Sequence, residues 1–280
     1  MKSEKKVWFV TGSSTGLGRA LVFALLNQGY HVIGTARKPE TLDPLVEQYP
    51  EQLITLPVDV TSKDQIHKAV EKAEAHFGQI DVLVNNAGYG LQSAIEEATD
   101  QQIRHQFEVN LFGAIEMIKA VLPIMRQQGS GHIANVTSVG GFTGAPSFGY
   151  YVGTKFALEG VSESLALEAA HLGIKVTIIE PGAFRTEWAG RSLVRSTPMS
   201  SYEKSVGAAR EWIDNENGKQ QGDPALGAAA IIKAITSPNP PLRLVIGKDA
   251  LDRIRQKIYS MSDELNFWEN VTVNTAFTQA

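Results

Sequence analysis

A tyrosine and a lysine four residues apart form the first pattern in this 280-residue chain that could do chemistry. Tyr151 and Lys155 fall near the start of Tyr150–Leu172, a stretch with helical periodicity, and this spacing places both side chains on one helix face. A free tyrosine has a pKa of about 10, which is high for acid–base catalysis at neutral pH. A neighbouring ammonium group stabilises the phenolate and lowers that pKa. The pair therefore predicts an acid–base site, although a packed ring beside an exposed lysine explains the same spacing.

A glycine-rich segment near the N-terminus is the second pattern. Thr11–Gly18 (TGSSTGLG) lies between a short apolar run and a helical repeat, where glycines let the backbone turn tightly and approach a pyrophosphate. The helix beyond offers free N–H groups and the positive end of its dipole. The spacing is GxxxGxG rather than the GxGxxG dinucleotide fingerprint, so a loop without a ligand is the alternative. The residues expected to contact a dinucleotide here are Gly12, Ser14, Thr15, Gly16, Leu17 and Gly18.

The end of the next apolar run indicates which dinucleotide is bound. An NAD-binding domain normally places Asp or Glu there, to accept hydrogen bonds from the adenosine ribose. This chain instead has Ala36, Arg37 and Lys38. A guanidinium group can bind a 2′-phosphate in a forked geometry, so Arg37 favours NADP(H) as the cofactor. A solvated basic turn is the alternative interpretation.

The elements that must position these residues follow an alternating pattern. Short runs rich in Val and Ile alternate with longer helical stretches, which is typical of βαβ units with right-handed crossovers. The runs expected to form strands are Lys6–Thr11, His31–Thr35, Gln52–Pro57, Ile80–Asn85, Gly131–Ser138, Ile174–Glu180 and Leu242–Gly247. The main helices expected are Ser62–Phe77, with Ser62 as N-cap, Asp100–Gln128 and Tyr150–Leu172. The pattern predicts an α/β, Rossmann-like, doubly wound fold with a mostly parallel seven-stranded sheet and helices on both faces.

The last third of the chain departs from this pattern. We expect residues 1–280 to form one domain, with the irregular segment 187–222 as a substrate-binding lid and 223–280 as a C-terminal extension. Four rings, Phe142, Phe148, Trp188 and Tyr202, could line an apolar pocket or simply pack the lid onto the core. Apolar residues at helical spacing in Ala250–Trp268 predict a packing helix or a subunit contact.

Composition and charge exclude several classes of protein. The formal net charge is -4, which gives no electrostatic footprint for nucleic acid. The chain has no cysteine, and its six histidines lack metal-ligand spacing, so we expect no metal site. The apolar run before Gly12 is too short for a signal peptide or a membrane span, so we expect a cytoplasmic protein without membrane contact. Glu96 and Glu97 are expected to form a solvated patch, and Glu180 a buried, hydrogen-bonded carboxylate.

Further motifs appear in the order typical of one family, so the chain resembles the short-chain dehydrogenase/reductases of the compact TGxxxGxG and YxxxK branch. Ser138 lies thirteen positions before Tyr151, the spacing of the family's catalytic serine. The resemblance covers residues 5 to 186. The other matching segments are Asp59-Val60, the NNAG motif Asn85–Gly88, Asn110 in the long helix, and Pro181–Thr186.

The resemblance implies a role for each matching residue. Tyr151 would exchange a proton with the substrate oxygen, Lys155 would lower the tyrosine pKa and hold the nicotinamide ribose, and Ser138 would hydrogen-bond the reacting oxygen. Asn110 would hold a water that links Lys155 to solvent. The remaining residues implied in cofactor binding are Asp59, Val60, Asn86, Ala87, Gly88, Pro181, Gly182, Phe184 and Thr186.

These assignments predict an NADP(H)-dependent carbonyl reductase or alcohol dehydrogenase. Its substrate would be a small or medium carbonyl compound or secondary alcohol, and the aromatic lid residues favour a lipophilic one. By analogy with the family we expect a homodimer or homotetramer through the two long helices. A non-catalytic NADP(H)-binding sensor is the alternative, and a nucleotide-sugar epimerase of the extended branch is disfavoured by the loop spacing.

Overall fold

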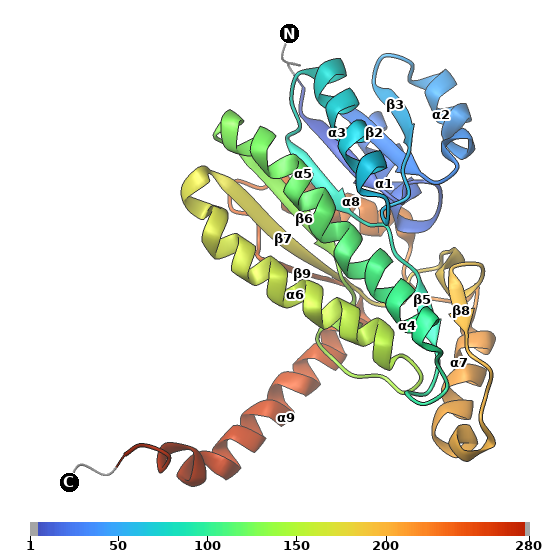
Figure 1. The fold of residues 1–280 in the computed structure, drawn as a ribbon, viewed down its shortest axis with the longest axis vertical. Coiled ribbons are helices and arrows are strands. Elements are labelled where there is room, and N and C mark those ends of the chain that lie inside the picture. The colour runs from blue at the N-terminus through green and yellow to red at the C-terminus, as the bar shows by residue number, and fades with distance from the viewer. Residues whose placement is uncertain (1–4, 278–280) are drawn as a thin grey trace.

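A computed structural model describes residues 5–277 and contains a seven-stranded parallel sheet (Figure 1). The strand order is β3-β2-β1-β4-β6-β7-β9, which confirms the predicted doubly wound fold. The strands of this sheet are β1 Val7–Thr11, β2 His31–Ala36, β3 Leu53–Pro57, β4 Val82–Asn85, β6 Gly131–Val136, β7 Ile174–Pro181 and β9 Arg243–Ile246. The order reverses at β1, so β1 and β4 lie side by side, and crevices at such switch points bind ligands.

Helices cover both faces of this sheet and bury two separate apolar layers. On one face the core contains side chains of α3, α5 and α6, and on the other it contains side chains of α1, α2 and α8. These helices are α1 Gly16–Asn27, α2 Asp43–Gln48, α3 Lys63–Phe77, α5 Gly113–Gln128, α6 Gly149–Ala169 and α8 Pro224–Ile235. Val and Ile point to both faces of the central strands, which is why those strands read as continuous apolar runs.

Local signals fix where several helices begin and end. The Ser62 hydroxyl accepts a hydrogen bond from the Gln65 N–H, which confirms the predicted N-cap of α3. Gly78 ends the same helix in the left-handed conformation, at φ 75°. The next helix, α4 Asp100–Phe107, begins with a capping box between Thr99 and Gln102.

The predicted helix over Asp100–Gln128 differs from the structure at its centre. A single π-helical turn, Glu108–Phe112, separates α4 from α5 and contains Asn110. The Asn110 side chain binds the backbone N–H and carbonyl of Tyr89, which ties this turn to the loop after β4. Such turns widen the helix by one residue and occur frequently at functional sites.

The segment 187–222 is more ordered than the sequence predicted. It contains the short strand β8 Leu193–Arg195, which pairs in parallel with β5 Gly90–Gln92, and the helix α7 Ala208–Glu216. In Figure 1 the segment lies beside α4, beyond the carboxyl ends of the strands. The strand β8 forms because it pairs with β5, which is far away in the sequence, so apolar periodicity within the segment could not predict it.

The last helix, α9 Lys248–Val273, projects from the rest of the molecule (Figure 1). Only Ala250 and Ile254 of this helix are buried, against Val139 and Phe142. The predicted helix is confirmed. Of its described residues, only those in the first two turns pack against the rest of the chain. Among the described residues, 5–277, no helix has the length and apolar character needed to cross a membrane.

Candidate active site

The glycine-rich loop lies at the carboxyl end of β1, directly beside the loop that follows β4. Gly12 has φ 64°, and a Cβ on it would stand 2.7 Å from the Ala87 Cα. Gly16, with φ 56°, opens helix α1. The preceding Thr15 makes no side-chain capping bond, so the first N–H groups of α1 remain available to an anion. The loop therefore has the shape and donors of a phosphate cradle.

Asn86 holds this loop against the loop after β4. Its amide Nδ2 donates to the carbonyls of Thr11 and Gly12, each at 3.0 Å. The Thr11 hydroxyl in turn accepts from the N–H groups of Asn86 and Ala87. A Cβ at Gly18 would stand 2.4 Å from Asn86 Nδ2. Gly18 is therefore required for close packing behind the loop and is not itself in the cavity wall.

One cavity of about 770 Å³ connects this loop with the Tyr151–Lys155 pair. Its volume falls in the range of ordinary cofactor and ligand sites. Except for Gly18 and Asn110, every residue named from the sequence as catalytic or cofactor-binding lines it. These lining residues are Gly12, Ser14, Thr15, Gly16, Leu17, Arg37, Asp59, Val60, Asn86, Ala87, Gly88, Ser138, Tyr151, Lys155, Pro181, Gly182, Phe184 and Thr186.

Tyr151 and Ser138 meet where the carboxyl end of β6 approaches the start of α6. Ser138 follows the strand in extended backbone geometry, and its Oγ accepts the Gly140 N–H at 3.0 Å. Burial raises the pKa of Tyr151 to about 12, while a hydrogen bond with Ser138 acts to lower it. The phenol is thus protonated at neutral pH in this arrangement, and Tyr151 lines the cavity.

Lys155 lies one helical turn beyond Tyr151 and is also buried. Its Nζ lies 5.8 Å from the centre of the Tyr151 ring and donates to the Val136 carbonyl at 2.9 Å. Burial lowers the pKa of Lys155 to about 8, and the charge of Glu159 acts to raise it. The sequence predicted that Lys155 would lower the tyrosine pKa. In the structure burial of the phenol is the largest effect on its pKa, and Lys155 Nζ is directed to the Val136 carbonyl.

Asn110 lies behind the cavity rather than in its wall. The side chain is 1% exposed, and its Oδ1 would be 3.1 Å from a Cβ at Gly88. Its Nδ2 donates to the Tyr89 carbonyl at 2.9 Å and to the Thr154 hydroxyl at 3.4 Å. The side chain is therefore committed to holding the π-helical turn against the loop after β4.

A buried group of acidic side chains lies on the far side of Lys155. Glu180, at the end of β7, is fully buried as predicted, but neither of its carboxylate oxygens accepts the predicted hydrogen bond, and Arg243 of β9 lies 3.4 Å from the carboxylate. Glu159, one turn beyond Lys155, also pairs with Arg243 and accepts the Thr137 hydroxyl at 2.6 Å. Burial, followed by the neighbouring Glu159, raises the pKa of Glu180 to about 7, and Arg243 partly opposes this. One guanidinium therefore faces two buried carboxyl groups.

Aromatic side chains close the cavity on the side of Tyr151. Trp188 lies 5.3 Å from Tyr151 and 5.7 Å from Phe148, measured between ring centres. Trp212 and Ile213 of α7 continue the same apolar wall. Two of the four rings singled out from the sequence lie elsewhere. Phe142 packs beneath the start of α9, and the Tyr202 hydroxyl bonds the Glu96 carboxylate outside the cavity.

The prediction of a solvated patch at Glu96 and Glu97 is wrong for Glu97. Its carboxylate is buried, pairs with Arg210 and accepts N–H groups from Ala94 and Met199. Burial raises the pKa of this carboxyl, but the backbone hydrogen bonds and the guanidinium outweigh that effect and lower it overall. Glu97 thus ties segment 187–222 to the β5–α4 loop. Nothing local in the sequence distinguishes it from its exposed neighbour.

Many lining residues carried no signal in the sequence, and four of them are aromatic or charged side chains. Tyr89 and His105, with ring centres 5.7 Å apart, both line the cavity. Asp249 and Arg253, from the first two turns of α9, also line it. The Asp249 carboxylate accepts the Ala183 N–H at 2.8 Å and thereby positions the segment after β7. Because β9 pairs with β7, the helix α9 that follows β9 begins beside the segment after β7.

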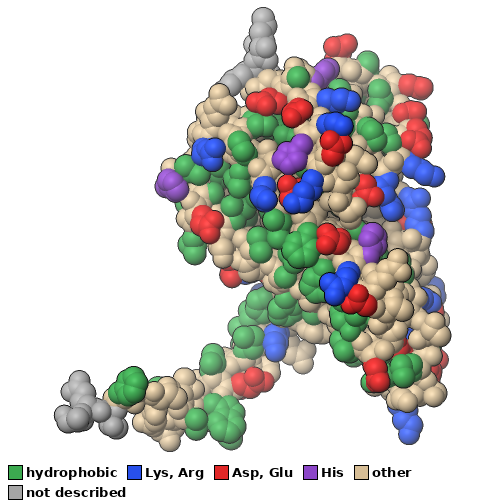
Figure 2. Space-filling view, in the orientation of Figure 1, with side chains coloured by type: hydrophobic (Ala, Val, Ile, Leu, Met, Phe, Trp, Pro, Cys, Tyr) green, Lys and Arg blue, Asp and Glu red, His purple; other side chains and the backbone are tan. Residues whose placement is uncertain are grey.

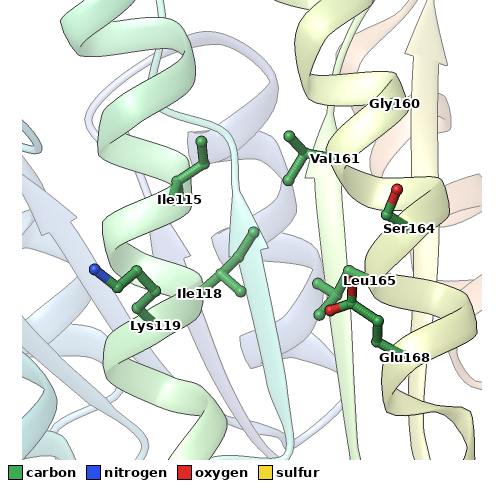
Figure 3. A pocket seen from close by; sticks show the side chains of 8 residues that line it. All are labelled: Ile115, Ile118, Lys119, Gly160, Val161, Ser164, Leu165 and Glu168. Atoms are coloured by element: carbon green, nitrogen blue, oxygen red, sulfur yellow. The ribbon is translucent and has the colours of Figure 1, made fainter.

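A smaller hollow lies between α5 and α6. It is lined mainly by apolar side chains such as Ile115, Ile118 and Val161, with Lys119 and Glu168 at its margin (Figure 3). Among residues 5–277, no group of His, Asp or Glu side chains has the arrangement of a metal site.

Known proteins share both the sequence pattern and this fold. The family model for short chain dehydrogenases matches residues 6–194. A short-chain dehydrogenase from Streptomyces avermitilis has 43% identity and a TM-score of 0.93, over 98% of this chain and 100% of its own. A 3-ketodihydrosphingosine reductase from Bacteroides thetaiotaomicron is 38% identical, over 87% of this chain and 88% of its own. An alcohol dehydrogenase from Thermococcus sibiricus, solved with 5-hydroxy-NADP, has 26% identity and a TM-score of 0.72, over 87% and 96% of the two chains.

Proposed function

Because this chain belongs to the short-chain dehydrogenase/reductase family of oxidoreductases, we propose that it reduces a lipophilic carbonyl compound with NADP(H). The observation that carries the proposal is the single cavity that joins the phosphate cradle at Gly12–Gly18 to the hydroxyls of Ser138 and Tyr151. A dinucleotide and a small substrate can therefore occupy one continuous space. Reduction and the reverse oxidation use the same groups.

The cofactor site suits a 2′-phosphate at its adenosine end. Arg37 follows β2, lines the cavity and lies close enough to Asp59 to help lower the pKa of that carboxyl. Its guanidinium group can turn to a phosphate, and no carboxylate stands at the end of β2 to accept hydrogen bonds from ribose hydroxyls. When bound, the nicotinamide supplies the hydride, while the chain supplies orientation and a polar environment.

The proton for the substrate oxygen would come from Tyr151. The buried phenol remains protonated at neutral pH, which favours its action as an acid toward a carbonyl oxygen. Ser138 donates a second hydrogen bond to the same oxygen and stabilises the charge that develops there. Lys155 has a pKa lowered to about 8, so it can carry a proton toward the tyrosine or hold ribose hydroxyls. Asn110 positions these groups through the π-helical turn.

The walls around the reacting groups favour an apolar substrate. Phe148, Trp188, Trp212 and Ile213 surround the approach to Tyr151, and they offer apolar surfaces rather than charged groups. The similar reductase from Bacteroides acts, by its name, on 3-ketodihydrosphingosine, a ketone with a long hydrocarbon chain. We propose that segment 187–222 acts as the lid over such a substrate, within a single domain that spans residues 1–280.

Fluorescence titration with NADPH and NADH tests the cofactor assignment. Wild-type protein should bind NADPH at least about tenfold more tightly, because a charge-assisted contact contributes about 1.5–3 kcal/mol. Arg37→Asp should remove this preference. Lys38→Asp is the matched control, since Lys38 does not line the cavity, and it should change the ratio much less. Equal affinities in the wild type would overturn the assignment to NADP(H).

A panel of ketones and aldehydes of increasing apolar size tests the reaction. We expect NADPH oxidation that rises with apolar size and is lost in Tyr151→Phe. Tight dinucleotide binding with no turnover across the panel would instead support the non-catalytic sensor.

Two further proposals concern assembly and location and do not rest on the site. We propose a homodimer or homotetramer that uses the apolar faces of α5 and α6, where the hollow of Figure 3 lies. We also propose a cytoplasmic protein. Light scattering and cell fractionation test these two statements.

A further inference from the structure

Two carboxyl groups behind the active site are buried, unlike most charged side chains of the described chain. Figure 2 shows Lys, Arg, Asp and Glu side chains spread over the visible surface of the body. By contrast, Glu159 of α6 is 5% exposed and Glu180 of β7 is 0% exposed. Buried carboxylates are costly unless they are paired and hydrogen-bonded, so the contacts of these two groups decide how much charge they can carry together.

One guanidinium group is too little to neutralise both carboxylates. Arg243 Nε lies 3.2 Å from Oε2 of Glu159 and 3.4 Å from Oε1 of Glu180. The Nη2 of Arg243 donates to a third carboxylate, the exposed Glu163, at 2.6 Å. Among residues 5–277, no donor reaches Oε2 of Glu159 or either oxygen of Glu180 within hydrogen-bonding geometry. Two ionised carboxylates in this arrangement would repel each other, and a proton held between them removes the repulsion.

The contacts of the two groups differ, and the difference decides which of them holds the proton. Oε1 of Glu159 accepts a hydrogen bond from the Thr137 hydroxyl at 2.6 Å. Glu159 is also the closer of the two to Arg243, and its charge acts on the buried ammonium group of Lys155. These contacts favour an ionised Glu159. Glu180 has only the more distant guanidinium, and as a protonated acid it can donate to the Glu159 carboxylate beside it.

We propose that Glu159 and Glu180 share one proton, which Glu180 donates to Glu159, and that the charge left on Glu159 is the counter-ion of Lys155. Neither carboxyl group lines the cavity, so Glu159 is a positioning residue that acts through Lys155. The shared proton does not depend on any activity. The importance of the counter-ion for turnover rests on the function proposed above.

Lys155 is the group for which this single charge matters. Its Nζ donates to the Val136 carbonyl, which is a neutral acceptor, and burial lowers its pKa to about 8. The charge of Glu159 opposes that effect and keeps the amine protonated to higher pH. The groups that face the carboxyl pair are Lys155 and Glu163 of α6, Arg243 of β9 and the neutral Thr137 hydroxyl after β6.

Infrared difference spectroscopy of the full-length protein tests the shared proton without reference to turnover. At about pH 6, below the pKa of Glu180, the wild type should show the C=O stretch of a protonated carboxyl group, which ionised surface carboxylates lack. Glu180→Gln should remove this band, and the matched control Glu163→Gln should keep it. Absence of the band from the wild type, or its persistence in Glu180→Gln, would overturn the proposal.

Nuclear magnetic resonance of protein containing isotope-labelled lysine tests the counter-ion. The signal of Lys155 is the one that Lys155→Met removes. In Glu159→Gln the pKa of Lys155 should fall by about one, because the nearest negative charge is lost. Glu180→Gln is the matched comparison, since the glutamine amide can still donate to Glu159, and there the fall should be less than about half as large. An unchanged pKa in Glu159→Gln, or equal falls in the two variants, would contradict the counter-ion role.

The pH profile of turnover connects the carboxyl pair with the proposed reaction. Wild-type NADPH oxidation should decline on the alkaline side as Lys155 loses its proton, and in Glu159→Gln the decline should occur about one pH unit lower. A decline at the same pH in both proteins would contradict a role of the counter-ion in turnover. Absence of turnover from the wild type would contradict the proposed function alone, because the infrared band and the lysine titration still decide the shared proton and the counter-ion.

Discussion

The wall of the cavity that carries Tyr151 and the wall formed by segment 187–222 are held in place by different kinds of contact. Tyr151 and Ser138 sit on α6 and at the end of β6, elements whose apolar faces are buried in the sheet core. Segment 187–222 is held by the short β5–β8 ladder, by a small apolar cluster around Trp188 and Ile213, and by polar contacts to the β5–α4 region such as the buried Glu97–Arg210 pair. The first wall is rigid because a whole sheet must move to displace it.

The two walls therefore suit two different tasks, proton transfer and substrate binding. A proton-transfer site must hold its hydroxyls within a few tenths of an ångström of the positions that the reaction requires. A strand and a helix packed in the core can hold side chains with this precision. A substrate wall must admit molecules and close over them, and segments held by few contacts open more readily. Changes in the first wall should therefore alter turnover, and changes in the second should alter substrate binding.

The largest effect is expected at Tyr151. Tyr151→Phe keeps the ring packing against Phe148 and Trp188 but removes the proton donor, so kcat should fall by about 10³-fold. Affinity for the dinucleotide should remain near the wild-type value. Tyr150→Phe is the control, because that hydroxyl binds the Ile95 carbonyl outside the cavity. A fall of kcat in both variants would show that packing rather than the hydroxyl was disturbed.

The next effect should appear at the other wall, in Glu97→Gln. The change leaves Arg210 without its buried partner and weakens the bond to the Met199 N–H, so segment 187–222 should open more often. We expect KM for the carbonyl substrate to rise about tenfold or more, with kcat changed less. Steady-state kinetics and limited proteolysis measure this. Glu96→Gln, which loses an exposed contact to Tyr202, should have little effect, and equal effects would contradict the special role of Glu97.

A smaller effect on stability should arise behind the active site, at Glu180. Its folded-state pKa of about 7 lies above the ordinary 4.5, so the folded protein holds a proton that the unfolded chain releases. Stability should therefore fall as pH rises from about 4.5 to 7. Glu180→Gln should reduce this loss, with a gain on the order of 1–2 kcal/mol at pH 8 relative to pH 5. Thermal unfolding at both pH values measures it. Glu163→Gln, an exposed partner of Arg243, is the control, and the same pH response there would contradict the assignment.

The smallest effect is expected for the exposed pair of Arg195 and Asp214, within segment 187–222. Both side chains are about half exposed, and surface pairs contribute about 0–1 kcal/mol. Arg195→Ala should leave the unfolding temperature within about 2 °C of wild type and KM within about threefold. A change in KM as large as that in Glu97→Gln would show that surface contacts, rather than the buried pair, hold the segment.

Much of the fold was predictable from sequence, and nearly all of the residues predicted for the site line the cavity. Buried parallel strands must be continuous apolar runs, so the seven strands were visible as such. The cofactor loop, Ser138, Tyr151 and Lys155 follow those strands closely in the sequence, and the parallel arrangement brings the carboxyl ends together. Their residue types and spacing identified the site before any contact was known.

Tertiary structure alone decided the features that join distant parts of the chain. Glu97 and Glu96 have the same side chain and adjacent positions, yet only Glu97 is buried, because Met199 and Arg210 contact it. Asp249 and Arg253 reach the cavity only because β9 lies next to β7. The high pKa of Tyr151 depends on burial, which depends in turn on Trp188 and Phe148 covering the ring. Periodicity and local propensity report on residues within one or two helical turns of each other. Burial, cavity position and pKa arise instead from the packing and electrostatic interactions of residues far apart in the sequence.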